Sequence, residues 1–506
     1  MGFNSFAFIL VFLPILLIGW YILNRSQKYK VADAFLVVMS LYFYYTFGLT
    51  FLVILTVSLG VNYGLSALIL VIDSRDTGEN GLYKKIIKVV GVLFNLGLLF
   101  YFKYLGFFTE NFNAVFKTGF TVDNIIMPIG ISFFTFGQIS YIVDRANNEA
   151  SHYDFLEYAL YTVYFPKLIQ GPIALHKEMI DQFRDKSLRT YDSVRFAGGL
   201  MSFVIGLSKK VLLADVLSRV VNYGFEQTYY LDTLTVTAVM LAYTFQIYFD
   251  FSGYCDMANG VSIMLGYKLP TNFNSPYKAA SAKELWQRWH MTLSRFFIKY
   301  VYIPLGGSRK GKYRTIANVL IVFILSGLWH GAGWTYICWG LMQGLLVVWD
   351  DLGIVSVEKE GKFLFRKEPL LIIPKALGRA MTFIAFVASL VFFRSESVEK
   401  ALVMFRRFFF FTYPGFFTRT AANLDIAENY IFRQFLSQIG GDDTIVYMIT
   451  LVIYLVVSGF IITRKNTEEI VSTTNFDRKT LVGITVLFLW SFISLSAVST
   501  FIYFQF

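Results

Sequence analysis

The chain has 506 residues, of which 56% are hydrophobic and 16% charged, and its formal net charge is +11. Soluble domains carry about 25% charged residues, so this balance excludes an ordinary soluble enzyme and indicates a polytopic membrane protein. The basic residues fall in loops between apolar runs. This placement argues against nucleic-acid binding and is typical of topology signals and of contact with anionic lipid headgroups.

The first apolar run covers residues 5–23 and is long enough to span a bilayer. Its basic flank (Arg25, Lys28 and Lys30) follows the run, whereas a cleaved signal peptide carries its charges first. We therefore expect a retained first helix and an extracytoplasmic N-terminus. Hydropathy predicts further spans, some of them re-entrant, near residues 31–49, 50–72, 87–108, 124–143, 155–172, 196–217, 233–254, 316–333, 334–350, 369–393, 444–463 and 480–502.

Two of these runs contain unusual residues. The segment Met127–Tyr141 carries small polar side chains of the kind that hold membrane helices together, so we expect helix packing there, with a channel wall as the alternative. Pro166 and Pro172 interrupt the run 155–172 and predict an irregular or re-entrant turn. Such backbone is tolerated only inside protein or beside water.

A polar cluster closes the run 233–254. Gln246, Asp250 and Asp256 lie there, and a carboxylate is costly inside lipid, so we expect these side chains at the interior or edge of the bundle. They would orient a histidine or line a polar path if they are functional. The favoured interpretation is structural: they satisfy helix ends and backbone at a bend near Gly253.

The stretch 268–314 is strongly basic, which places most of it on the cytoplasmic side. Ser281 and Glu284 form a capping-box pattern that predicts the start of a helix. Large apolar residues, including Trp286 and Trp289, then recur at helical spacing up to Tyr300. The pattern predicts one amphipathic helix that lies along the interface or dips into it, with polar residues such as Gln287 and Arg288 opposite the apolar stripe.

His330 lies in a run from Thr315 to Trp349 that contains no charged residue. At ~1.5 Å per residue, the ~16 residues after Arg314 carry a helix ~24 Å towards or across the hydrocarbon core. An imidazole at that depth indicates a functional site, and the alternative is a structural histidine bonded to a carbonyl. With His290, which borders the amphipathic stripe, it suggests a site reached by a channel, where a histidine acts as general base.

Other chemistries have weaker support. Only four histidines exist, none is spaced for a metal site, and His152 and His176 resemble ordinary loop residues, so we expect no bound metal. Cys255 and Cys338 provide no disulfide framework. No serine or cysteine nucleophile is evident near either candidate histidine, which favours direct transfer.

Several segments together resemble the membrane-bound O-acyltransferase (MBOAT) family, and most closely its bacterial alginate O-acetyltransferase branch. The elements Arg-Trp-His at 288–290 and Trp-His-Gly at 329–331, in this order and ~40 residues apart, make the match specific. The matching segments are Met127–Phe133, Phe165–Lys167 with Gly171–Pro172, Tyr248–Tyr254, Asn272–Tyr277, Trp286–Ser294, Tyr302–Gly307 and Leu325–Gly331.

The apolar runs predict an all-α fold of about 11–13 transmembrane or re-entrant helices, and the resemblance implies that they form an MBOAT-type ring around a central two-sided channel. It implies an acyltransferase core over residues 1–410, while the sequence pattern beyond it predicts an extramembrane loop over 411–443 and two closing transmembrane helices over 444–506. The resemblance also implies that His330 is the catalytic histidine and His290 the second characteristic one. The remaining candidate substrate or channel residues are Trp329, Ser326, Trp286, Trp289, Arg288, Asp250, Asp256 and Gln246.

The implied function is transfer of an acetyl group from cytoplasmic acetyl-CoA, a co-substrate and not a bound cofactor. The acceptor would be a hydroxyl of a secreted polysaccharide or of an SGNH-type extracytoplasmic transferase, at a bacterial plasma membrane. Basic residues such as Lys278, Lys283 and Arg288 would attract the CoA phosphates, or serve topology alone. An oxyanion would be held by an N–H of 331–333 or by Ser326. The alternatives are D-alanyl or lipid-directed acyl transfer, or a non-catalytic acyl-carrier transporter or scaffold.

Overall fold

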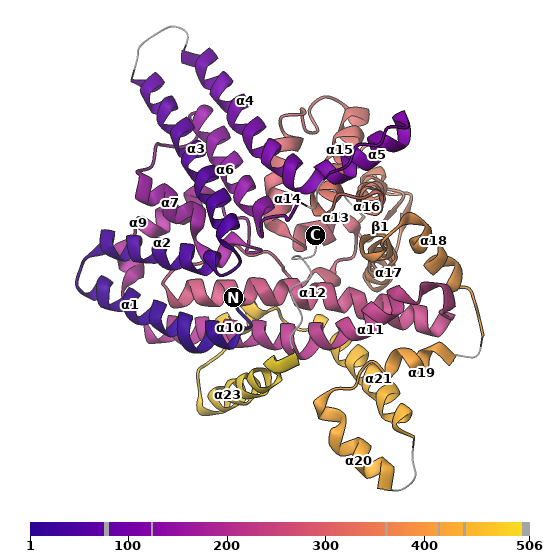
Figure 1. Ribbon diagram of the computed structural model, residues 1–506. Helices are drawn as coiled ribbons and strands as arrows, with labels where there is room; N and C mark the ends of the chain where they lie inside the picture. Colours follow the sequence, from indigo (N-terminus) through magenta and orange to yellow (C-terminus); the bar gives the residue numbers. More distant parts are fainter. Residues whose placement is uncertain (75–79, 123–124, 360–362, 413–414, 439–441, 498–506) are drawn as a thin grey trace. The chain divides into compact units, whose positions relative to one another are not determined.

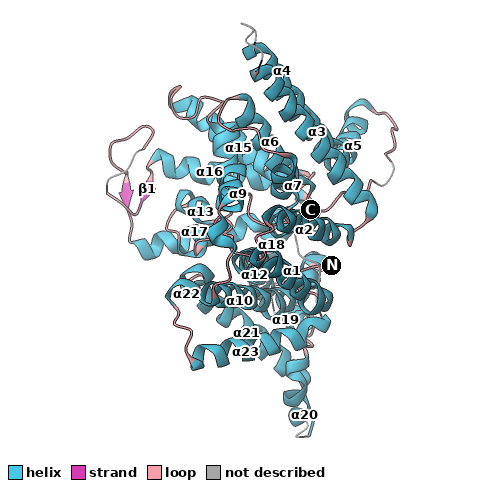
Figure 2. Cartoon of the chain, turned by 90° about the vertical axis from the view of Figure 1, so that its left-hand side faces the viewer, coloured by secondary structure: helices cyan, strands magenta, loops and turns pink. Residues whose placement is uncertain are grey.

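The protein is described by a computed structural model that covers residues 1–74, 80–122, 125–359, 363–412, 415–438 and 442–497. The regular secondary structure of these residues is almost entirely helical, which confirms the predicted all-α class (Figure 2). The sequence did not predict the two-residue strands β1 (Val355–Ser356) and β2 (Leu371–Ile372), which pair in parallel. The predicted span 480–502 extends beyond the described residues at its end, and the predicted span 124–143 begins outside them.

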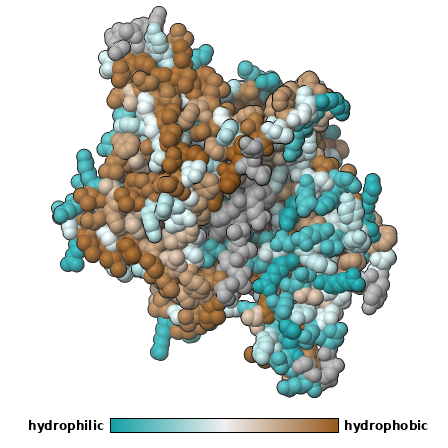
Figure 3. Space-filling model, viewed as in Figure 1, coloured by the Kyte–Doolittle hydropathy of each residue, from teal (hydrophilic) through white to brown (hydrophobic). Residues whose placement is uncertain are grey.

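The polytopic membrane character is also confirmed. Within the described part of the chain, seven helical segments are long and apolar enough to cross a bilayer. Apolar side chains cover the outer surface of two of them in Figure 3, over the labelled positions of α3 and α4 in Figure 1. The seven segments are Phe8–Arg25, Leu49–Asp73, Gly81–Phe116, Thr233–Met264, Lys312–His330, Lys375–Arg394 and Asp443–Ile462.

The chain forms two compact units. It passes from the first unit to the second within helix α10 (Ser193–Ser208) and returns to the first within helix α12 (Thr233–Met264). The first unit comprises Met1–Val204, Tyr254–Thr271 and Asn475–Leu481. Its main helices are α1 (Leu13–Arg25), α2 (Tyr29–Tyr45), α3 (Leu49–Asp73), α4 (Asn80–Leu99), α5 (Leu105–Phe116), α6 (Ile131–Ala146), α7 (Phe155–Val163), α8 (Phe165–Leu168) and α9 (His176–Arg184).

The second unit comprises Ile205–Gly253, Asn272–Thr474 and the chain from Val482 onward. It begins with the π-helix η4 (Lys209–Ala214) and α11 (Asp215–Glu226). Its later helices are α13 (Ala282–Arg288), α14 (Met291–Phe297), α15 (Lys312–His330), α16 (Trp334–Leu352), α17 (Lys375–Arg394), α18 (Val398–Arg407), α19 (Gly415–Ala421), α20 (Tyr430–Gln438), α21 (Asp443–Ile462), α22 (Thr467–Thr473) and most of α23 (Arg478–Ile493).

His176 corrects one expectation in the first unit. It is not an ordinary loop residue: it is 2% exposed and begins α9. Its Nε2 lies 3.0 Å from Asp144 Oδ2 on α6, and its Nδ1 lies 2.7 Å from the Tyr153 hydroxyl. A buried polar group is retained when its hydrogen bonds are satisfied, so this histidine holds α6, α9 and the segment before α7 together. The predicted interruption of the run 155–172 at Pro166 and Pro172 is confirmed, since α7 ends at Val163 and α8 is only four residues long.

Helices α15 and α16 of the second unit form a closely packed hairpin joined by Gly331–Gly333. Glycines allow the contact: a Cβ at Gly327 would lie 2.2 Å from the Tyr336 carbonyl oxygen, and one at Gly340 would lie 2.3 Å from the Phe323 carbonyl oxygen. Close approach of helices through small residues is a usual mode of packing in membranes. The hairpin therefore fixes the position of the last residue of α15, which is His330.

We expect Gly340→Val to force α15 and α16 apart, because the obstacle at 2.3 Å is backbone and cannot swing aside. Overpacking of this kind costs about 1–3 kcal/mol or more. Thermal unfolding of the purified protein in detergent should show a clearly lower midpoint. Gly459→Ala is the control, since a Cβ there meets nothing within 4 Å. Equal midpoints for the two variants would show that the hairpin tolerates separation.

Candidate active site

The second unit brings His290 and His330 side by side. His330 ends α15, His290 directly precedes α14, and their ring centroids are 6.2 Å apart. The two residues are 3% and 0% exposed, respectively. Two imidazoles that are 40 residues apart in the sequence thus lie next to each other in the interior. Both could contact one small group placed between them.

The backbone at His290 differs from the prediction. The expected single amphipathic helix is two helices, α13 and α14, because Trp289 is extended and His290 is left-handed, with φ 45° and ψ 48°. The predicted helix start is confirmed: the Ser281 side chain accepts the Glu284 N–H. A non-glycine residue at positive φ is uncommon and is over-represented at functional sites. The corner projects the His290 ring inward, where its centroid is 4.8 Å from that of Phe251.

Asn272 determines which nitrogen of His290 carries the proton. Asn272 Oδ1 accepts the backbone N–H of Thr292 (3.3 Å) and the Thr292 hydroxyl (2.9 Å), so this atom is the amide oxygen. It lies 3.1 Å from His290 Nδ1, which must therefore donate to it. The neutral ring then presents the lone pair of Nε2, which has no hydrogen-bond partner among the described residues.

Burial also decides the charge of His290, which lies outside the seven candidate spans. Loss of solvent lowers the pKa of its imidazole to about 3. Because this pKa lies below the usual value of about 6.5, protonation favours the unfolded chain, and stability from this site falls only as the pH drops below about 6.5. At neutral pH the ring is a hydrogen-bond acceptor and a base, not a cation.

Aromatic rings enclose His330. Its ring centroid lies 4.8 Å from that of Trp329, 5.2 Å from that of Trp339 and 5.2 Å from that of Phe393. The edge-to-face arrangements are the favourable ones for such pairs. Trp329 also lies 6.0 Å from His290. Because both histidines are almost wholly buried, a substrate reaches them only if some of these rings move.

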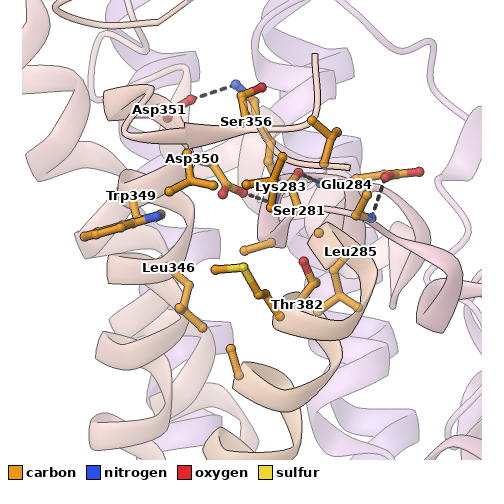
Figure 4. A pocket seen from close by; sticks show the side chains of 18 of the residues that line it. Ser281, Lys283, Glu284, Leu285, Leu346, Trp349, Asp350, Asp351, Ser356 and Thr382 are labelled. Carbon is orange, nitrogen blue, oxygen red and sulfur yellow. Dashed lines mark hydrogen bonds and ion pairs between the residues drawn. The ribbon is translucent and has the colours of Figure 1, made fainter. Parts of the chain in front are cut away.

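A cavity of about 690 Å³ lies in the second unit, and neither histidine lines it. Figure 4 shows its polar side, with Asp350 and Asp351, and its apolar side, with Leu285 and Leu346. Gln343 lines the cavity.

Hydrogen bonds and ring contacts connect the wall of this cavity to His330. Gln343 accepts the Trp286 Nε1–H (3.1 Å) and donates to the Ser389 hydroxyl (2.6 Å). The Trp286 ring then lies 5.8 Å from that of Trp339, which contacts His330.

The basic residues near this cavity are held in ion pairs. Lys283 Nζ lies 2.7 Å from Asp351, and Arg288 Nε lies 3.0 Å from Glu284. Arg288 also donates to the Asn274 carbonyl. These pairs are half-exposed, so they contribute little to stability. Such pairing fits a role in topology and local structure better than a clamp for phosphates.

Asp250, on α12, belongs to a buried ion cluster. Lys210 Nζ on η4 lies 2.7 Å from Asp250 Oδ1 and 2.8 Å from Asp215 Oδ1. Burial opposes the charge on Lys210, but the two carboxylates outweigh it and raise the pKa of the ammonium. Helix α12 does not end near Gly253 as predicted but continues to Met264, and Lys210 from η4 neutralises the Asp250 carboxylate on it.

The remaining predicted residues occupy different surroundings. Ser326 is buried on α15, one turn before His330. Trp289 packs against Phe386, with ring centroids 5.2 Å apart. Gln246 is buried on α12, and its side-chain oxygen has no hydrogen-bond partner among the described residues. Asp256 belongs to the first unit, where its backbone carbonyl accepts the Ser202 hydroxyl.

Sequence reasoning did not select Asn272, Trp339 or Phe393 as site residues. Asn272 lies in an irregular stretch with no periodic signal. Trp339 and Phe393 lie in apolar runs, where an aromatic residue is usually core packing. Only the fold identifies them, by bringing all three to the histidine pair.

Asn272→Leu should lower kcat for the acyl transfer that the resemblance implies roughly tenfold or more, because it removes the acceptor that fixes the His290 tautomer. KM should change little, because Asn272 contacts His290 and acts on the reaction through it. Asn272→Asp keeps an acceptor at this position and should restore much of the rate. Steady-state release of the thiol product measures both constants. If the leucine variant folds and retains the wild-type kcat, Asn272 has no positioning role.

Comparison with known proteins is consistent with this geometry. Residues 41–394 match the model of the MBOAT, membrane-bound O-acyltransferase family. The peptidoglycan O-acetyltransferase of Helicobacter pylori is 39% identical over 79% of this chain and 78% of its own length. The probable alginate O-acetylase AlgI of Pseudomonas aeruginosa is 35% identical over 81% and 75%, respectively. The teichoic acid D-alanyltransferase of Streptococcus thermophilus is 30% identical over 54% and 69%.

The matched segment contains all the residues described above around His290 and His330, from Phe251 to Phe393. It also covers most of the chain, and two of the relatives align over more than two thirds of both sequences. The predicted family and enzyme class are therefore confirmed. The chain belongs to the membrane-bound O-acyltransferase family, and the protein is a multi-pass membrane O-acyltransferase.

Proposed function

We propose that this protein transfers an acetyl group from acetyl-CoA to a hydroxyl of an extracytoplasmic polysaccharide, directly or through an SGNH-type extracytoplasmic transferase, at a bacterial plasma membrane with the N-terminus outside. The two relatives that cover most of the chain are named for O-acetylation, one on peptidoglycan and one on alginate. The relative named for D-alanyl transfer covers only 54% of it. The acetyl group and a glycan acceptor are the better supported pair.

The observation that carries the mechanism is the buried pair of His290 and His330, 6.2 Å apart. A hydroxyl attacks a thioester efficiently only if a base takes its proton and a donor stabilises the oxyanion. We assign proton removal to His330, which ends α15 directly before the loop Gly331–Gly333. His290, with Nδ1 bound to Asn272, keeps the Nε2 lone pair available to orient a hydroxyl.

In the proposed step, the acceptor oxygen bonds to the acetyl carbonyl carbon while His330 takes the hydroxyl proton. Collapse of the tetrahedral intermediate breaks the C–S bond, and the thiolate leaves with the proton returned from the imidazole. A buried, nearly dry site strengthens each of these interactions and keeps water from the thioester. The aromatic enclosure of His330 is consistent with such exclusion.

Purified protein supplied with [¹⁴C]acetyl-CoA and a polysaccharide acceptor tests the proposal. We expect free CoA and label in the glycan in equal amounts. Label that appears only when a carrier protein charged with ¹⁴C-labelled D-alanine replaces acetyl-CoA would instead support the D-alanyl function. Label that ends in lipid would support lipid-directed transfer. Absence of label in the glycan, with an SGNH-type partner also present, would contradict the proposed acceptor.

A further inference from the structure

A second cavity, of about 670 Å³, lies in the second unit away from the histidine pair. Ile449, Ile453, Val457 and Ile461 line it from α21. They recur every four residues, so they form one face of a helix. Because α21 is a candidate membrane span, this cavity is an apolar slot that runs along a segment able to sit in lipid.

Cationic side chains gather where α21 ends. Lys209, Arg464 and Lys465 all line the cavity. Lys209 Nζ donates to Thr467 Oγ1 (2.9 Å), which places this ammonium beside the segment that follows α21. Arg464 and Lys465 are exposed, and neither forms an ion pair within the described part of the chain. The cavity thus joins an apolar wall to a cluster of three positive charges.

One acidic residue, Glu428, also lines the cavity, and it accepts the Trp490 Nε1–H (3.0 Å). The three cations therefore outnumber it and favour an anionic group. The volume lies in the range of about 300–1,000 Å³ that is typical of small-molecule sites. Basic pockets beside membrane helices bind anionic lipid headgroups. An apolar slot with a cationic end fits an amphipathic anion and fits neither a polar solute nor a neutral lipid.

We propose that this cavity binds an anionic glycerophospholipid, with an acyl chain along α21 and its phosphate at Lys209, Arg464 and Lys465. One residue that lines the cavity also contacts a neighbour of His290 in the sequence. Tyr248 lines the cavity, and its ring lies 6.2 Å from that of Trp289. The bound lipid would thereby stabilise the packing of Trp289, the residue that precedes His290.

Native mass spectrometry of the purified full-length protein tests the proposal with phosphatidylglycerol and phosphatidylcholine of the same acyl chains. We expect selective retention of phosphatidylglycerol. The double variant Arg464→Gln/Lys465→Gln should bind it roughly 30-fold more weakly, because each cation near an anionic headgroup contributes about a factor of five. The matched control Arg366→Gln/Lys367→Gln removes two exposed cations that do not line the cavity and should leave binding unchanged.

A second pair of variants tests the apolar slot. Val457→Trp fills the cavity and should reduce phosphatidylglycerol binding, whereas Val456→Trp, on a position outside the cavity lining, should not. This pair decides the question if the charge variant fails to fold. Equal retention of the two lipids, or equal loss in both members of either pair, would overturn the proposal. Acetyl transfer is not the readout, so the result is independent of the proposed function.

Discussion

His330→Ala should reduce acetyl transfer by roughly 10²–10⁴-fold, the usual contribution of a general base. The loss should appear in kcat, because the imidazole acts on the hydroxyl proton in the transition state and not on substrate binding alone. The residue ends α15, and its ring contacts Trp329, Trp339 and Phe393. Release of CoA from acetyl-CoA by purified protein measures the effect.

Two controls separate chemistry from folding in this experiment. His152→Ala removes a half-buried histidine of the first unit and should retain the wild-type rate. His330→Gln keeps a polar side chain of similar length but cannot take a proton at neutral pH, so it should be as inactive as the alanine variant. A monodisperse His330→Gln protein with the wild-type rate would show that proton removal occurs elsewhere.

Lys210→Met should be the most destabilising of the substitutions considered for the second unit. The ammonium lies 2.7 Å from Asp250 and 2.8 Å from Asp215, and all three side chains are at most 7% exposed. Removing one partner of a buried ion cluster costs about 3–5 kcal/mol, because the remaining charge keeps its desolvation penalty without the compensating attraction. Thermal unfolding in detergent should therefore occur at a markedly lower temperature, or the protein should fail to accumulate.

The charge-neutral triple variant Lys210→Met/Asp215→Asn/Asp250→Asn is the matched control for Lys210→Met. It removes both carboxylates along with the cation, so it should recover much of the lost stability. Its activity also reports on the site, because Phe251 follows Asp250 on α12 and contacts the His290 ring. Unfolding of the single variant at the wild-type temperature would show that the cluster is dispensable.

Long apolar helices could be predicted closely from the sequence. The expected spans 50–72 and 444–463 correspond to α3 (Leu49–Asp73) and α21 (Asp443–Ile462). Hydropathy succeeds there because the bilayer sets both length and composition. It failed at the end of α12: the predicted span stops at residue 254, whereas the helix continues through the polar residue Asp256 to Met264.

The candidate site was predictable in part. The unusual depth of His330 and its resemblance to a family motif identified one ring, and the second motif identified His290. The corner at His290 was not predictable, since the aromatic residues around it keep helical spacing across the break. Tertiary hydrogen bonds decide it: the Met291 N–H donates to the Asn272 carbonyl, and the Asn272 side chain accepts from His290 and Thr292. No local pattern encodes such a partner.

The most direct measurement is a structure of the protein with a non-hydrolysable acetyl-CoA analogue. The acetyl carbonyl carbon should lie beside His330, with Trp329 or Trp339 displaced from the positions that now bury the ring. The His290 Nε2 should then face the same small volume. An analogue bound with its acetyl group against other residues, while both histidines remain enclosed, would contradict the assignment of this pair as the place of transfer.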